Sequence, residues 1–115
     1  MDDAEKARRA ALGKKIENDI RRTDAYGIYR VTDRPGCFPN FISEGIKRLV
    51  EADGDFARLS LDLASCFYSG DYGHMYDWDE HPTKNYEAGL YTTDWGEIYF
   101  KREVNRTTMC MYFER

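Results

Sequence analysis

Alternation of apolar and polar residues is clearest in the last third of the chain. Three β-prone runs occupy residues 86–92, 97–102 and 107–113, and short turn-forming segments separate them. In the second run Ile98 and Phe100 alternate with other residues, as expected of a strand with one buried face. Consecutive runs of this kind predict an antiparallel β-meander. We expect its apolar face to cover the core and its Tyr- and Thr-rich face to meet solvent or a partner.

Apolar residues at helical spacing predict two helices in the first half of the chain. The first spans residues 3–22, and because the first half of its apolar stripe is only alanine, we expect its first two turns to project. The second starts near residues 39–40 and carries a broad apolar face. Asp53 ends this helix, with Gly54 beyond its last turn. A short β-prone run at residues 28–31 lies between the two helices.

Residues 55–68 fit two structures. Leu59, Leu61 and Leu63 alternate as they would in a strand, but the apolar residues of the run also fall on one face of a helix. We favour the helix, because Asp55 is a good N-cap and the run is long. The whole pattern predicts an α+β fold in which N-terminal helices pack on a small antiparallel sheet with a C-terminal three-stranded meander. At 115 residues we expect a single domain.

Charge and composition narrow the class of function. The formal net charge of −4 argues against a nucleic-acid binder, because such proteins usually carry a basic surplus. Residues 1–22 are slightly basic, whereas residues 71–97 hold seven acidic residues against Lys84 alone. Three widely spaced cysteines form no metal-binding pair and no disulfide framework, so we expect reduced thiols and a cytoplasmic protein. We expect neither a signal peptide nor a membrane span, since no apolar run has the necessary length.

The segment of residues 69–85 holds the densest set of chemically active side chains. It is a long loop rich in Gly, Asp and aromatic residues, it contains both histidines of the chain, and long loops in small domains often carry function. Tyr and Trp are enriched at protein interfaces, which favours binding of a protein partner by this loop. The predicted binding residues are Asp71, Tyr72, His74, Tyr76, Asp77, Trp78, Asp79, Glu80 and His81.

Three other interpretations of this loop stay open. Histidines and carboxylates are ligands for zinc, iron or manganese, so His74, His81, Asp77 and Asp79 would serve a metal-dependent hydrolase. Their spacing, however, matches no metal-binding motif. A display of carboxylates can instead imitate a nucleic-acid backbone and inhibit a host DNA-binding or defence protein. The plainest interpretation is that the acids cap backbone groups and meet water.

Residues 55–115 contain a Gly-Asp-aromatic-Gly loop, then an Asp and an Asn, and then a β-meander. Its pieces are Gly70-Asp71-Tyr72-Gly73, Asp79, Asn85, the Gly-Leu-Tyr run at 89–91, Gly96-Glu97-Ile98-Tyr99 and Thr107-Thr108. In these features the chain resembles small uncharacterised proteins that are common on bacterial plasmids, phages and integrative elements. The final Pro-Glu-Tyr typical of that family is replaced here by Phe113-Glu114-Arg115. The resemblance implies an accessory protein of a mobile element and carries over no activity.

Taken together, these patterns favour a non-enzymatic interaction protein. We expect no cofactor, no catalytic residue and no membrane association. The expected ligand of loop 69–85 is a protein partner, and nucleic acid is not favoured. Because an open meander leaves edge strands that can pair, a homodimer is also compatible with the sequence.

Overall fold

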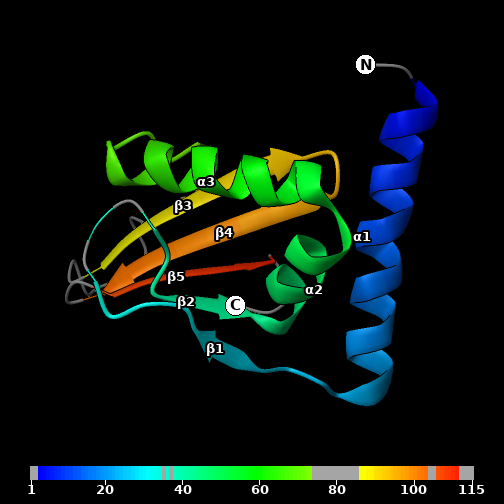
Figure 1. Ribbon diagram of the computed structural model, residues 1–115, viewed down its shortest axis with the longest axis horizontal. Coiled ribbons are helices and arrows are strands. Elements are labelled where there is room, and N and C mark those ends of the chain that lie inside the picture. The colour runs from blue at the N-terminus through cyan, green and yellow to red at the C-terminus, as the bar shows by residue number, and fades with distance from the viewer. Residues whose placement is uncertain (1–2, 35, 37, 74–85, 104–105, 112–115) are drawn as a thin grey trace, which may run out of the picture.

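The computed structural model describes residues 3–34, 36, 38–73, 86–103 and 106–111. Along the chain, its elements are α1 (Asp3–Thr23), β1 (Ile28–Arg30), β2 (Phe41–Ser43), α2 (Glu44–Ala52), α3 (Gly54–Tyr68), β3 (Tyr86–Thr93), β4 (Gly96–Glu103) and β5 (Arg106–Met111). The helices α2 and α3 lie on one face of the sheet, and α1 stands at the end of the sheet (Figure 1). The predicted α+β class is confirmed, and so is the helix favoured for residues 55–68.

The strands of the described residues form one five-stranded sheet in the order β1-β2-β5-β4-β3. The predicted meander is confirmed, because β3, β4 and β5 pair antiparallel in chain order. The sheet as a whole is mixed rather than antiparallel, since β2 pairs parallel to β5, with Ile42 opposite Met109. The sequence predicted the start of a helix where β2 lies. Three residues are too few to show an alternation pattern, so this strand left no periodic signal.

The second helix begins later than its apolar pattern predicted, because the preceding residues pair as β2. Ser43 is the N-cap of α2, and its hydroxyl accepts a hydrogen bond from the backbone N–H of Ile46. Asp53 serves two helices. Its backbone N–H closes the last turn of α2, and its carboxylate accepts from the N–H of Asp55 at the start of α3. The predicted cap at Asp55 is therefore wrong by two positions, and Gly54 is the first residue of α3.

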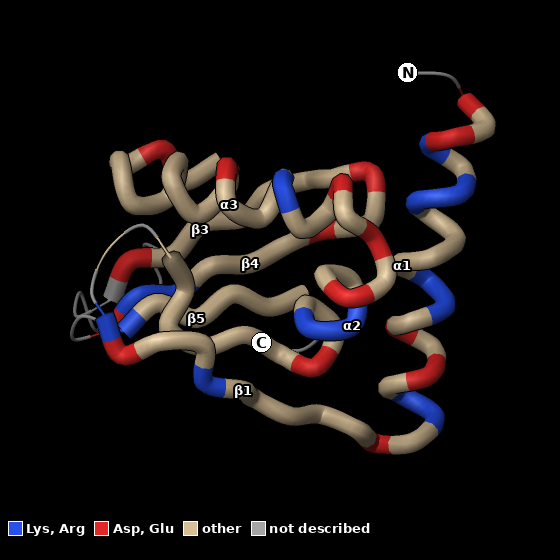
Figure 2. Tube along the Cα trace, in the orientation of Figure 1, with Lys and Arg blue, Asp and Glu red and all other residues tan. Residues whose placement is uncertain are grey.

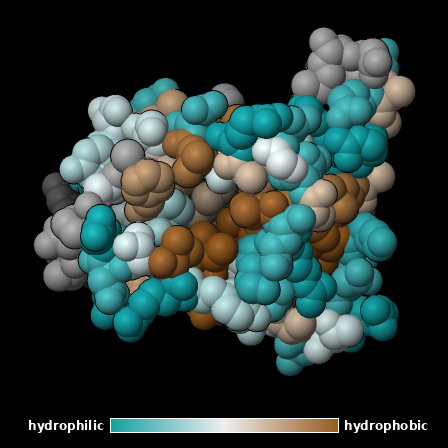
Figure 3. All heavy atoms as spheres, in the orientation of Figure 1, coloured by the Kyte–Doolittle hydropathy of each residue, from teal (hydrophilic) through white to brown (hydrophobic). Residues whose placement is uncertain are grey.

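The core lies between the helices and the inner face of the sheet, which is the face that α2 and α3 cover. Phe67 of α3 stacks on Phe100 of β4 with 5.3 Å between ring centroids, and Tyr91 of β3 meets Phe100 edge to face. In Figure 3 hydrophobic atoms also reach the surface between α3 and α2. The buried residues of this core are Ile16, Ile20, Ile46, Leu49, Phe56, Ala64, Phe67, Tyr91, Trp95, Ile98, Phe100, Met109 and Met111.

The outer face of the sheet, away from α2 and α3, is less open than its sequence suggested. Ala88, Leu90, Tyr99 and Cys110 form a second buried cluster there. The expectation of an exposed Tyr-rich face is therefore wrong for the middle of the sheet. Thr108, nearer the end of the same face, stays partly exposed. Cys110 lies buried in this cluster.

The helix α1 packs on the turn between β3 and β4. Arg9, Gly13, Ile16 and Ile20 form its buried face. A Cβ atom at Gly13 would lie 1.8 Å from the carbonyl oxygen of Trp95, so the helix touches the backbone of the turn. Neither α1 nor any other helix of the described residues combines the length and the apolar character of a membrane span.

Candidate functional site

The loop predicted to bind a partner starts at a closely hydrogen-bonded helix end. After Tyr68 the chain forms a Schellman motif, in which the N–H of Gly70 bonds to the carbonyl oxygen of Phe67 at 3.2 Å. The N–H of Asp71 bonds to the carbonyl oxygen of Cys66 at 2.9 Å. Gly70 has a φ of +94°, a left-handed conformation that glycine adopts without steric cost. The helix end therefore sets the direction in which the chain leaves α3.

The residues after Gly70 attach the loop to β3. The N–H of Leu90 donates to the carbonyl oxygen of Tyr72 at 3.1 Å, and Gly73 forms a parallel bridge with Leu90. The Tyr91 hydroxyl donates to the carbonyl oxygen of Asp71, and burial raises the pKa of this phenol, so it keeps its proton at neutral pH. Only glycine fits at Gly73, where φ is +63° and a Cβ would lie 2.3 Å from the Leu90 carbonyl oxygen.

Aromatic and charged side chains surround this start of the loop. The Tyr72 ring meets Phe67 edge to face, with 5.4 Å between the centroids. Burial, together with a hydrogen bond to the Glu87 carboxylate, raises the pKa of Tyr72. Arg102 pairs with Glu87 and lies over the Tyr68 ring, which is 52% exposed. An exposed aromatic ring and a paired arginine thus lie next to the loop.

Of the predicted binding residues, the structure describes Asp71 and Tyr72, which belong to residues 70–73, here called the loop base. One carboxylate oxygen of Asp71 accepts from the N–H of Gly73 at 3.2 Å, so this side chain stabilises the turn itself. Among the described residues, no group of three His, Cys, Asp or Glu side chains is placed to hold a metal ion. The other predicted residues lie outside the described part of the chain: His74, Tyr76, Asp77, Trp78, Asp79, Glu80 and His81.

Arginines from elsewhere in the fold pair with some of the acids in the acidic region, residues 71–97. Glu87 pairs with Arg102 on the neighbouring strand, and Asp94 lies 3.1 Å from the Arg9 guanidinium of α1. A nucleic-acid mimic needs a dense display of unpaired carboxylates. These two pairs reduce that density on the described part of the region.

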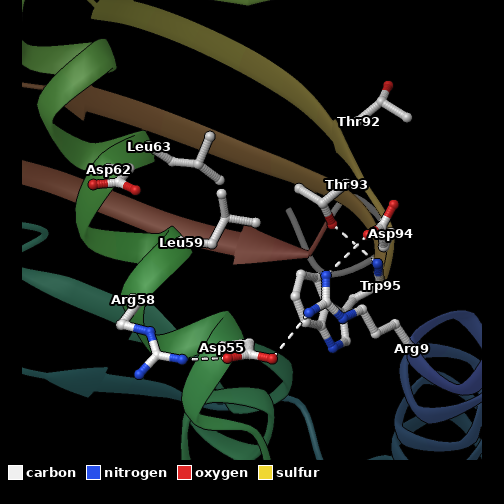
Figure 4. A pocket seen from close by; sticks show the side chains of 10 residues that line it. All are labelled: Arg9, Asp55, Arg58, Leu59, Asp62, Leu63, Thr92, Thr93, Asp94 and Trp95. Atoms are coloured by element: carbon white, nitrogen blue, oxygen red, sulfur yellow. Dashed lines mark hydrogen bonds and ion pairs between the residues drawn. The ribbon is translucent and has the colours of Figure 1, made fainter. Parts of the chain in front are cut away.

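A cleft away from the loop base lies between α3, the β3–β4 turn and α1, and Figure 4 shows its side chains. It is a cleft of about 490 Å³. The Arg9 guanidinium reaches across one end of it, bonding to Asp94 at 3.1 Å and to Asp55 at 2.9 Å. The central carbon of this guanidinium lies 4.4 Å from the centre of the Trp95 ring. The lining residues are Arg9, Asp55, Arg58, Leu59, Asp62, Leu63, Thr92, Thr93, Asp94 and Trp95.

Asp53, between α2 and α3, connects the β3–β4 turn beside this cleft with α1. The indole N–H of Trp95 donates to the Asp53 carboxylate at 3.1 Å, and Arg8 donates to it at 3.3 Å. Burial disfavours the charged form of Asp53, but these bonds and the N–H of Asp55 outweigh burial and lower the pKa of Asp53. Arg8, Arg9, Asp53, Asp55 and Asp94 thus take part in bonds between elements. Such an arrangement suits a structural joint better than a reaction centre.

Sequence reasoning missed the cleft. The charges of a mixed-charge helix usually face solvent, so the sequence predicted no buried role for Arg9. Its spacing from Gly13, Ile16 and Ile20 puts it on the apolar stripe of the helix, and this spacing is the signal that could have found it. Nothing local indicates that Trp95, on a turn far along the chain, meets that stripe.

Asp53→Asn is expected to lower stability at neutral pH and to make the protein less sensitive to acid. The folded-state pKa of Asp53 lies below its ordinary 3.8, so the ionised carboxylate stabilises the fold above that pH. This stabilisation is lost as the pH falls through the lowered pKa. Thermal melts followed by circular dichroism from about pH 7 down to about pH 2 should show the two melting temperatures converging in acid. Asp33→Asn, at an exposed position, is the control, and a gap between wild type and Asp53→Asn that is constant with pH would contradict the expectation.

Comparisons of the chain with known proteins gave no match. No protein-family model, no curated protein and no solved structure matches the chain.

Proposed function

We propose that this chain is a non-enzymatic interaction protein that binds a protein partner through loop 69–85. The observation that carries the proposal is the loop base, where Tyr72 and Gly73 are bonded to β3 and the Tyr91 hydroxyl holds the backbone of Asp71. A loop that starts from a fixed position loses less conformational freedom on binding. More of the contact energy then appears as affinity.

The chemistry of the loop supports a protein as the ligand. Tyr76 and Trp78 offer large apolar surfaces with polar tips, which protein interfaces favour. The acids around them would select a partner with basic residues and speed its approach. Exposed Tyr68, with Arg102 over its ring, extends the aromatic character onto the described surface beside the loop.

The cellular role that we propose is that of an accessory protein of a bacterial mobile element. Its support is the resemblance of residues 55–115 to small proteins of plasmids, phages and integrative elements. A role of this kind needs a host or element protein as partner and requires no chemistry of its own. The paired charges around Arg9 and Asp53 agree with such a role, because these side chains bond to other elements of the fold.

The double variant Tyr76→Ala, Trp78→Ala is expected to abolish capture of the partner from a cell lysate while the fold is kept. The two substitutions remove the largest apolar surfaces of the loop and leave the loop base intact. Immobilised wild-type and variant proteins should be compared by mass spectrometry of the captured proteins, with melting temperature as the measure of folding. Leu61→Ala, which trims a 49% exposed side chain on α3, is the matched control and should retain capture.

Capture that is equal for the double variant and for wild type would remove the loop from the binding surface. A stoichiometric transition metal in the purified protein, lost when His74 and His81 are replaced, would favour the metal-dependent hydrolase instead.

A further inference from the structure

A groove on the outer face of the sheet lies beside the edge strand β1. It has a volume of about 230 Å³ and lies where β1, β2, β5 and β4 are neighbours. The residues that line it are Ile28, Phe41, Lys101, Glu103, Arg106 and Thr108. None of these described lining residues belongs to loop 69–85.

The register of the strands places basic and apolar side chains together on this face. Arg30 is opposite Phe41, Phe41 is opposite Thr108, and Thr108 is opposite Lys101, so the four side chains form one row. The Arg106 guanidinium lies over the Phe41 ring, 5.5 Å from its centre. In Figure 2 Lys and Arg positions gather at this end of the sheet.

The local charge of the groove is positive although the whole chain carries −4. Among the lining residues, Lys101 and Arg106 stand against one acid, Glu103, which lies 3.1 Å from Lys101. Arg30 adds a further positive charge in the same row of side chains. Arg30 also lies 3.5 Å from Asp33, but both side chains are mostly exposed, and exposed pairs at such distances are weak. An acidic ligand is therefore favoured at this face.

The backbone of β1 is open on its outer side. The carbonyl oxygen of Gly27 accepts from the residue after β2, and the N–H of Val31 donates to the residue before β2. Backbone groups of successive residues point to alternate sides of a strand, so Tyr29 also faces β2. The N–H and C=O groups of Ile28 and Arg30 consequently point away from the sheet. Within the described part of the chain no strand pairs with this side of β1, so these groups can bond to a further strand.

Apolar side chains are exposed along the same edge. Ile28, which also lines the groove, is 57% exposed, and Tyr26 and Val31, which lie on either side of β1 in the chain, are each exposed by half or more. An edge strand with exposed apolar side chains is a template for the addition of another strand. Ile28 thus contributes to the groove through its side chain and to the open edge through its backbone.

We infer that β1 and the groove bind an extended acidic segment of a protein partner, which adds to the sheet as a sixth strand. The backbone groups of Ile28 and Arg30 would bond to the added strand, as in other cases of β-augmentation. The positive groove beside them provides charge complementarity for the acidic side chains of the segment. A nucleic acid fits less well, because it offers no peptide backbone to the open edge.

The geometry also predicts the order of side chains in the bound segment. In antiparallel pairing, the residue opposite Arg30 comes first along the segment and the residue opposite Ile28 comes two positions later. The side chains of the segment that lie opposite Arg30 and Ile28 are on the same face of the sheet as Arg30 and Ile28, which is the face of the groove. The segment should therefore read acidic–any–apolar from its N-terminus, with the acid opposite Arg30 and the apolar residue opposite Ile28.

Fluorescence anisotropy of a labelled peptide tests the inference. The probe carries Glu-Thr-Val in the centre of a Ser/Thr octapeptide, and control peptides carry Val-Thr-Glu and Lys-Thr-Val instead. The Glu-Thr-Val probe is expected to bind saturably and at least about tenfold more tightly than either control, a difference of about 1.4 kcal/mol in binding free energy. Arg106→Glu is expected to weaken binding at least about tenfold, whereas Arg22→Glu, the same charge change on exposed α1, should leave it unchanged.

Ile28→Pro tests the strand addition separately, since it removes an N–H that points away from β2 and is expected to abolish binding. If Ile28→Pro has a lower melting temperature than wild type, the test of the inference rests on Arg106→Glu. The Arg106 side chain is exposed, so this substitution should leave the fold intact. Equal binding of the three peptides would overturn the inference, as would displacement of the probe by a single-stranded oligonucleotide. The double variant Tyr76→Ala, Trp78→Ala should bind the probe normally, so this inference and the proposed loop function fail independently.

Discussion

Gly13→Ala is expected to destabilise the protein by about 3 kcal/mol, although alanine is the better helix former. On helix propensity alone the substitution should stabilise α1 by about 1 kcal/mol. In the fold, however, the new Cβ would lie 1.8 Å from the carbonyl oxygen of Trp95 and 2.9 Å from its carbonyl carbon. Both are backbone atoms of the β3–β4 turn, which cannot move without disturbing two paired strands. Urea denaturation followed by circular dichroism measures the change in unfolding free energy.

Gly54 provides the matched control for Gly13. It also lies in a helix, but a Cβ at this position would meet no atom within 4 Å. Gly54→Ala is therefore expected to leave the unfolding free energy unchanged or to raise it by about 0.5 kcal/mol. If Gly13→Ala were as benign as Gly54→Ala, the close packing of α1 on the turn would be disproved.

Trp95→Ala is expected to reduce the unfolding free energy by about 4 kcal/mol, since it removes a large buried aromatic side chain. Trp95 is only 4% exposed and meets Phe56 edge to face, with 5.3 Å between ring centroids. Its loss would also remove the donor to Asp53 and the ring beneath Arg9. Urea denaturation should show an earlier midpoint with a similar slope if the variant still folds cooperatively.

Trp95→Phe separates packing from hydrogen bonding at the same position. Phenylalanine keeps an aromatic ring against Phe56 and under Arg9 but has no N–H for Asp53. The expected cost is about 1.5 kcal/mol, the order of one hydrogen bond to a charged group. A cost equal to that of Trp95→Ala would show that the bond to Asp53, rather than aromatic packing, dominates at this joint.

The start of the candidate loop illustrates how far sequence reasoning reaches at the site. Gly70 and Gly73 marked a break after a helical run, and the structure explains both, one by a helix end and the other by contact with β3. Asp71 accepts from the N–H of Gly73, which agrees with the plainest interpretation of the acids as caps of backbone groups. The sequence predicted a glycine-containing loop from local residues alone, whereas the pairing of Tyr72 and Gly73 with Leu90 depends on where β3 lies.

The local pattern of the chain was enough to determine the α+β class, the C-terminal meander and the helix at residues 55–68. Each of these elements repeats its apolar residues with its own period over six or more positions, so the information lies within the element. Cap residues were less certain. Asp53 and Asp55 have the same chemistry, so the pattern could not tell which of them caps α3. The start of α2 was displaced because the residues before it pair as β2.

The tertiary structure alone decided the parallel pairing of β2 with β5, the open edge at β1 and the joint of Arg9, Asp53 and Trp95. These features bring together residues that are separated by tens of positions, as Asn40 and Thr107 are beside the β2–β5 pair. Their partners depend on how the helices and strands assemble, and no local period records that assembly. Arg9 and Trp95 meet only when α1 packs on the β3–β4 turn, and β2 becomes a strand only where β5 lies beside it.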